Sequence, residues 1–123
     1  MSIYDANKDK VRYRYVVYKK DTNKNRSIFY IGTNIMKDVG FNIKDKIMII
    51  PEEGNFILKK DIFGKILRWK TSRVQSNFAE IIYYESMRKS LGLRKSRSLV
   101  TLAHEIRLDP HDPQNNQLVV TFK

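Results

Sequence analysis

Short apolar runs separated by polar turns extend along most of this chain and predict a mainly β protein. The run Val11–Lys20 alternates tyrosine and valine with arginine, a pattern typical of a strand with one buried face. The polar segment Asp21–Arg26 separates it from a second apolar run, Ser27–Ile31, and this arrangement favours a β-hairpin. In such a strand, Arg12 and Arg14 lie on one face and Tyr13 and Tyr15 on the other.

A short helix is predicted next, over Asn34–Val39, because its apolar residues recur at helical spacing. Gly40 suits the left-handed conformation that commonly ends a helix. The apolar run Ile47–Ile50 then predicts a buried strand. The turn Pro51–Gly54 connects it to an expected hairpin partner, Asn55–Lys60.

The second half of the chain repeats this order of elements. Phe29–Ile50 aligns with Ile81–Leu102 without a gap at an offset of 52 residues, and apolar positions fall opposite apolar positions. Two copies of a strand–helix–strand unit related by a pseudo-two-fold axis are therefore predicted. The expected elements of the second copy are strands over Ile66–Thr71, Ala79–Tyr84, Leu99–Leu102 and Gln117–Phe122, and a helix over Ser86–Leu91 that ends at Gly92.

The repeat divides the chain into a loose N-terminal arm over 1–10, a first copy over 11–61 and a second copy over 62–123, packed together as one domain. The copies differ most at Glu105–Asn116. Two Asp-Pro steps there disfavour helix and regular strand pairing, so the segment is expected to be an inserted loop. The fold class predicted is mainly β with two short helices (α+β).

Charge narrows the class of partner. The chain of 123 residues has 24 basic and 13 acidic residues, a net charge of +11, and no cysteine for disulfides or thiolate metal sites. Its N-terminus is polar and no apolar run reaches the roughly 20 residues of a membrane span, so a cytoplasmic protein with no membrane partner is expected. The excess charge predicts nucleic acid as partner; an acidic protein surface and plain solubility are the alternatives.

The basic residues gather on the first hairpin, along and just after the strand at 66–71, and around the second helix. No acidic residue lies between Met87 and His104, so the last group can neutralise several adjacent phosphates, although a solvated helix face is the alternative. The predicted nucleic-acid-binding residues are Arg12, Arg14, Lys19, Lys20, Lys24, Arg26, Lys70, Arg73, Arg88, Lys89, Arg94, Lys95 and Arg97.

Aromatic residues are interleaved with these charges at Tyr13, Tyr15, Tyr18 and Trp69. Such side chains can stack on the bases of single-stranded nucleic acid. More often they form the buried face of an amphipathic strand, and that is the expectation for these four residues.

Catalysis is not expected. His104-Glu105 and Asp109-Pro110-His111-Asp112 place both histidines near carboxylates, as hydrolases and metal sites require. There is, however, no third ligand at helical spacing, no Gly-rich phosphate loop and no nucleophile elbow. A surface loop without a metal or cofactor is the expectation.

The first copy resembles the AbrB/SpoVT and MazE type of swapped-hairpin domain, in which two strands, a short helix and two more strands follow one another. Gly32 stands where that family usually has proline, and Lys44 precedes Asp45 where the family usually has glycine. The residues that carry the resemblance are Phe29–Ile31, Asn34–Gly40, Phe41–Ile50 and Phe56–Lys59.

The resemblance implies a barrel-like fold with a pseudo-two-fold axis. In that family two chains exchange hairpins, and the dimer binds DNA through basic residues of the first strand pair and nearby loops. A chain with both copies would build the pseudo-dimer as a monomer, although a homodimer is also compatible. The function predicted is DNA binding, with DNA favoured over RNA, by a small transcriptional regulator or chromatin-like protein. The alternative is a phage-type inhibitor that docks on an acidic host protein.

Overall fold

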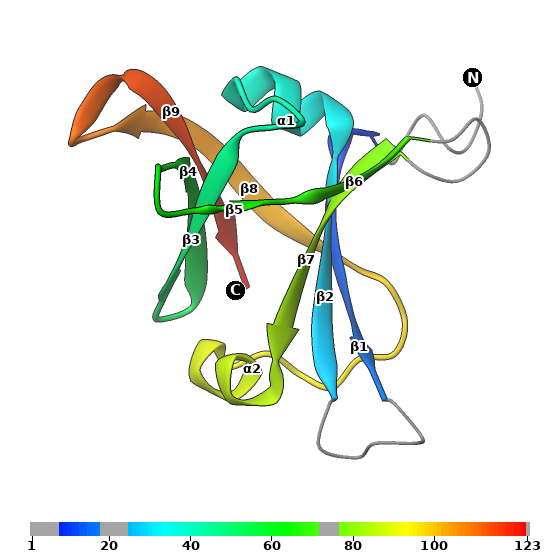
Figure 1. The fold of residues 1–123 in the computed structure, drawn as a ribbon. Helices are drawn as coiled ribbons and strands as arrows, with labels where there is room; N and C mark the ends of the chain where they lie inside the picture. Colours follow the sequence, from blue (N-terminus) through cyan, green and yellow to red (C-terminus); the bar gives the residue numbers. More distant parts are fainter. Residues whose placement is uncertain (1–7, 18–24, 72–76, 123) are drawn as a thin grey trace.

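The computed structural model describes residues 8–17, 25–71 and 77–122. Within these ranges the chain forms two helices, α1 (Thr33–Val39) and α2 (Glu85–Leu91), and an antiparallel sheet (Figure 1). No helix in the described ranges has the length and apolar character needed to cross a membrane. The strands are β1 (Val11–Val16), β2 (Arg26–Gly32), β3 (Lys46–Glu52), β4 (Asn55–Lys60), β5 (Lys65–Ile66), β6 (Arg68–Thr71), β7 (Asn77–Tyr84), β8 (Val100–Asp109) and β9 (Asp112–Thr121).

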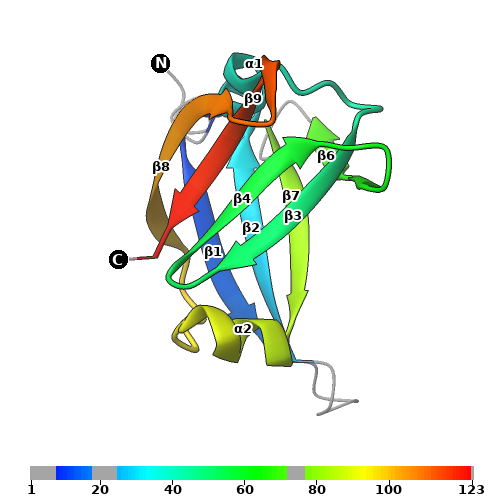
Figure 2. The ribbon, with the colours of Figure 1, turned by 90° about the vertical axis from the view of Figure 1, so that its left-hand side faces the viewer.

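The sheet nearly closes into a barrel (Figure 2). Its strand order is β5-β3-β4-β9-β8-β1-β2-β7-β6, so β5 and β6 lie at its two edges. These edge strands are separated in sequence only by the buried residue Leu67. One bent segment therefore pairs with β3 through its first part and with β7 through its second part, and it joins the two edges. The expectation of a mainly β, barrel-like fold with two helices is confirmed.

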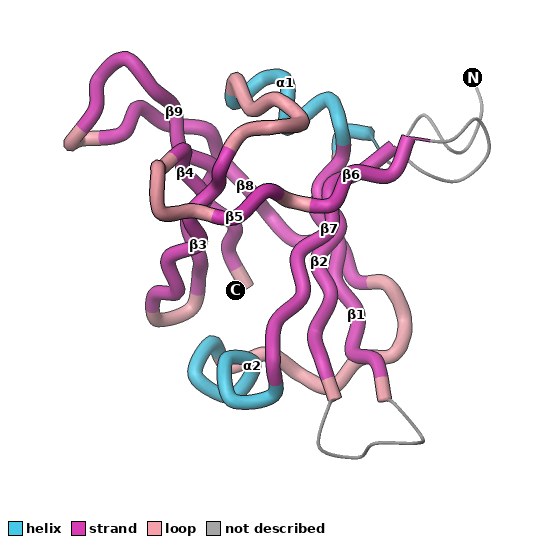
Figure 3. The backbone as a smooth tube through the Cα atoms, in the orientation of Figure 1, coloured by secondary structure: helices cyan, strands magenta, loops and turns pink. Residues whose placement is uncertain are grey.

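The two halves of the sequence interleave around this barrel (Figure 3). The β1–β2 hairpin lies between β8 and β7, and β3–β4 lies between β5 and β9. At the centre of the β2–β7 pair, Phe29 lies opposite Ile81, the residue that the 52-residue offset makes its equivalent. Antiparallel strands related by a two-fold axis pair in this way.

The gapless alignment does not continue past the helices. β3 begins at Lys46, six residues after Gly40, whereas β8 begins at Val100, eight residues after Gly92. The aligned residues Ile47 and Leu99 consequently differ, because the first is 2% exposed in the core and the second is 50% exposed. The longer linker of the second half carries Arg94, Lys95 and Arg97.

Each helix ends as its glycine predicts. Gly40 and Gly92 have φ of 95° and 72°, and next to them Phe41 N donates to Met36 O at 2.8 Å and Leu93 N to Arg88 O at 3.1 Å. The two helices lie at opposite ends of the barrel (Figure 1).

Aromatic residues fill the barrel interior. Phe29 packs against Phe56 and Tyr83, with ring centroids 4.9 and 5.0 Å apart. Tyr13 and Tyr15 are buried and Trp69 packs against the core from a partly buried position, as expected. Tyr18 lies outside the described residues.

The expected loop at 105–116 is instead the β8–β9 hairpin, so that prediction was wrong. Pairing runs from Ala103↔Thr121 to Leu108↔Asn116, then jumps to Asp109↔Asp112. The irregularity leaves Pro113 outside the regular register, where its missing N–H costs no ladder hydrogen bond. Asp109 accepts a hydrogen bond from His111 N at 2.8 Å, which holds the pKa of its carboxyl below the usual value.

Candidate nucleic-acid interface

The linker between α2 and β8 runs beside the end of β1. Tyr15 N donates to Ser96 O at 2.5 Å, and the Tyr13 hydroxyl donates to Arg94 O at 3.4 Å. This tether brings two basic groups together that are far apart in the sequence. Arg14 of β1 and Arg97 of the linker line the same surface hollow, whose volume is about 270 Å³.

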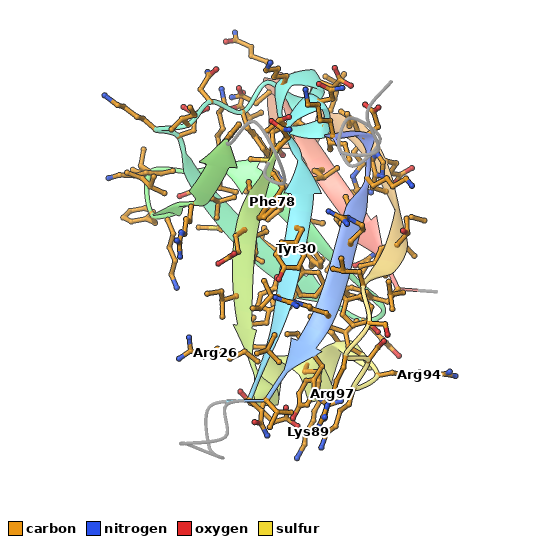
Figure 4. The ribbon with its side chains drawn as sticks, turned by 90° about the vertical axis from the view of Figure 1, so that its right-hand side faces the viewer. Arg26, Tyr30, Phe78, Lys89, Arg94 and Arg97 are labelled. Carbon is orange, nitrogen blue, oxygen red and sulfur yellow. The ribbon has the colours of Figure 1, made fainter. Side chains whose placement is uncertain are left out.

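Three cations of the group around α2 form no ion pair with any described residue. Lys89, Arg94 and Arg97 are exposed, and none of them pairs with a carboxylate of another described residue. All three lie toward one end of the barrel, together with Arg26 at the start of β2 (Figure 4). The charges of Lys89, Arg94 and Arg97 are therefore available to an external anion.

Arg88 does not belong to this exposed group, which corrects the sequence-based prediction. It is 8% exposed and donates from Nη2 and Nε to Glu85 at 2.7 and 3.2 Å. Its Nη1 donates to Leu93 O at 2.6 Å. The hydrogen bond to Glu85 is the main reason that the pKa of Arg88 is raised and that of Glu85 is lowered. Glu85, the acid that pairs with Arg88, precedes Met87 and so lies outside the acid-free segment between Met87 and His104 on which the prediction was based.

Lys95 is exposed like Lys89 but, like Arg88, lies near Glu85. Its Nζ lies 4.0 Å from Glu85 and 5.6 Å from the centroid of the Tyr15 ring, yet its side chain is 57% exposed. Arg88 approaches the same ring at 5.7 Å. A loose pair at this exposure contributes little to stability, so Lys95 can exchange Glu85 for a phosphate.

The arginines of β1 point away from the core. Arg14 is exposed; its Nε donates to the Tyr30 hydroxyl at 2.9 Å and its guanidinium lies 5.8 Å from that ring's centroid. Arg12 is half-buried, and its Nε has no hydrogen-bond acceptor among the described residues. Burial lowers the pKa of Arg12, but a guanidinium stays protonated at neutral pH.

Not every predicted residue can be placed. Lys19, Lys20, Lys24 and Arg73 lie outside the described residues, as does the side chain of Lys70, whose backbone forms part of β6. Conversely, the prediction missed Tyr30 and Phe78, whose side chains lie on the outer side of β2 and β7 (Figure 4), where Tyr30 is 7% exposed and Phe78 is half-buried. Alternation with the buried Phe29 and Ile31 is the signal that could have placed Tyr30 there.

The structure gathers no set of metal-ligating side chains in the part of the chain that it describes. His104 and His111 are both exposed, and no cluster of three or more potential metal ligands occurs among the described side chains. The arrangement offers guanidinium and ammonium donors, which suit anion binding.

Comparisons with protein-family models, curated proteins and solved structures found no match for this chain. The likeness to swapped-hairpin domains therefore depends on the sequence motifs alone.

Proposed function

We propose that this protein binds nucleic acid, with DNA as the favoured form, as a small regulator or chromatin-like protein. The binding surface would be the basic end of the barrel, which we define as Arg14, Lys89, Arg94, Lys95 and Arg97. The observation that supports the proposal is the tether between β1 and the linker, which gathers these exposed cations from separate parts of the sequence.

Phosphate binding is the chemistry that this surface fits best. Lysine and arginine displace condensed counterions when they neutralise phosphates, and this release supplies most of the sequence-independent affinity. The net charge of +11 adds long-range attraction for a polyanion. The swapped-hairpin likeness favours DNA within this class. The barrel joins its edges within one chain, so the proposal needs no second copy.

A salt titration with fluorescently labelled random duplex DNA and single strands tests the proposal. If five cations each neutralise one phosphate, the slope of log affinity against log salt should be about −4.5 for duplex and about −3.5 for a single strand. Absence of binding to either form at low salt would overturn the proposal.

A charge-reversal pair locates the site. The triple variant Lys89→Glu/Arg94→Glu/Arg97→Glu should abolish binding. The control triple Lys10→Glu/Lys37→Glu/Lys44→Glu changes the net charge equally. It uses exposed lysines of α1 and of the segments that adjoin its two ends, and α1 lies at the other end of the barrel. If both triples lose affinity equally, net charge drives binding and the basic end is not a site.

A second candidate function is docking on an acidic protein. One observation favours it: Ile62 and Phe63, in the turn before β5, are 77% and 82% exposed next to the exposed Lys65. Exposed aromatic anchors with neighbouring cations are typical of protein interfaces. Recovery of one stoichiometric acidic protein from nuclease-treated lysate, without any nucleic-acid binding, would favour this candidate.

A further inference from the structure

The outer face of β1, β2 and β7 combines arginines with apolar and aromatic side chains. We define this outer face as Arg12, Arg14, Tyr30, Phe78 and Ile82. In the sheet, Arg12 of β1 lies opposite Tyr30 of β2, and Tyr30 lies opposite Glu80 of β7. Phe78 and Ile82 flank Glu80 on the same face of β7. Figure 4 looks onto this face, and no described helix or strand crosses it.

The side chains of the outer face are held in a defined arrangement. The Phe78 and Tyr30 rings meet edge to face, with centroids 4.9 Å apart. Arg14 is fixed over Tyr30 by its Nε hydrogen bond, and Tyr30 is only 7% exposed, so the half-buried Phe78 is the ring on this face that a ligand can contact. The two terminal nitrogens of Arg14 remain to contact a ligand. Ile82 is 41% exposed beside them. Because these groups are already ordered, binding would cost little side-chain entropy.

This mixture fits an unpaired nucleotide better than a duplex. In a duplex the flat faces of the bases are stacked inside, so an aromatic protein surface meets only sugars and phosphates. In a single strand the base faces are free to stack on aromatic rings and guanidinium planes while the phosphates contact arginine. The carboxylate on this face, Glu80, lies opposite Arg68 of β6, so the acid has a cation beside it.

We propose that the outer face binds single-stranded nucleic acid, with a base stacking at Phe78 beside the exposed Ile82 and with phosphates on Arg12 and Arg14. The bound nucleic acid continues from the outer face onto the basic end, since Arg14 belongs to both surfaces. This inference rests on the proposed function, because the basic end supplies the electrostatic part of the affinity. It adds the form of nucleic acid that is recognised.

The test compares a labelled 15-nucleotide single strand of mixed sequence with the duplex of the same length at one low salt concentration. We expect tighter binding of the single strand. Phe78→Leu keeps an apolar side chain and removes the ring, and it should weaken single-strand binding about 5-fold or more, since stacking contributes about 1–3 kcal/mol per base. Phe63→Leu is the matched control, with the same chemical change in the turn before β5, outside the outer face, and should leave affinity unchanged.

The outcomes separate the two proposals. Tighter binding of the duplex, or equal single-strand affinity of Phe78→Leu and wild type at equal melting temperature, overturns the inference while leaving the proposed function intact. Loss of all binding in the Lys89/Arg94/Arg97 reversal supports the proposed function independently of Phe78. If Phe78→Leu lowers the melting temperature, Phe78→Tyr keeps the ring and should have the stability and the single-strand affinity of the wild type. Wild-type stability with weakened affinity in Phe78→Tyr would also overturn the inference.

Discussion

Replacing Arg88 by methionine should destabilise the fold, although the sequence places this residue in an exposed basic cluster. The variant removes the hydrogen bond to Leu93 O and the two contacts with Glu85. A buried carbonyl left without its donor costs about 1–3 kcal/mol. The Glu85 side chain is 27% exposed and water can solvate it, so the lost pair adds only about 0.5–1 kcal/mol.

The expected total is a loss of about 1.5–4 kcal/mol in the free energy of unfolding, a large part of the 5–15 kcal/mol typical of a domain. Urea unfolding followed by circular dichroism measures it. Lys89→Met is the matched control, because the neighbouring Lys89 is exposed and should change stability by less than about 0.5 kcal/mol. Arg88→Lys should be intermediate, since an ammonium lacks the planar fork that serves both acceptors.

The pH dependence has a definite sign. Because Arg88 lowers the pKa of Glu85 in the folded state, their pair stabilises the fold above the ordinary pKa of glutamate, and this stability is lost as pH falls through the lowered value. The difference between wild type and Arg88→Met should therefore shrink below about pH 4, leaving the Leu93 contribution. Equal unfolding midpoints for Arg88→Met and Lys89→Met at pH 7 would refute the structural role.

Two further substitutions test the barrel itself. Gly64→Ala should lower the free energy of unfolding by about 3 kcal/mol, measured by urea unfolding. The new Cβ would lie 2.5 Å from the backbone carbonyl carbon of Ile47 and would push β5 away from β3. A loss below about 1 kcal/mol would contradict this close approach. Tyr83→Phe should raise stability by about 1 kcal/mol, because the buried Tyr83 hydroxyl has no hydrogen-bond partner among the described residues; a destabilised variant would show that the hydroxyl is satisfied.

The sequence alone predicted most of the local structure. Alternation in Val11–Val16 placed Tyr13 and Tyr15 inside and the arginines outside, and a glycine marked the end of each helix. These features depend on periodicity and backbone conformation within a few residues, which the chain displays directly. Proline was a weaker guide, because a register shift accommodates Pro113 within the β8–β9 hairpin.

Tertiary structure decided the closure of the barrel and the composition of the candidate site. No local pattern indicates that Lys65–Ile66 and Arg68–Thr71 pair with opposite edges of one sheet, because strand pairing between distant segments depends on the whole fold. Likewise, Arg88 and Lys89 are neighbours with similar charges. The turn at Gly92 brings Leu93 O to Arg88, and the helix places Glu85 beside it, whereas Lys89 stays in solvent. Tertiary structure decides which hydrogen-bond acceptors lie within reach of a cation, and therefore whether that cation stabilises the fold or remains exposed to a ligand. The sequence shows only that the charge is present.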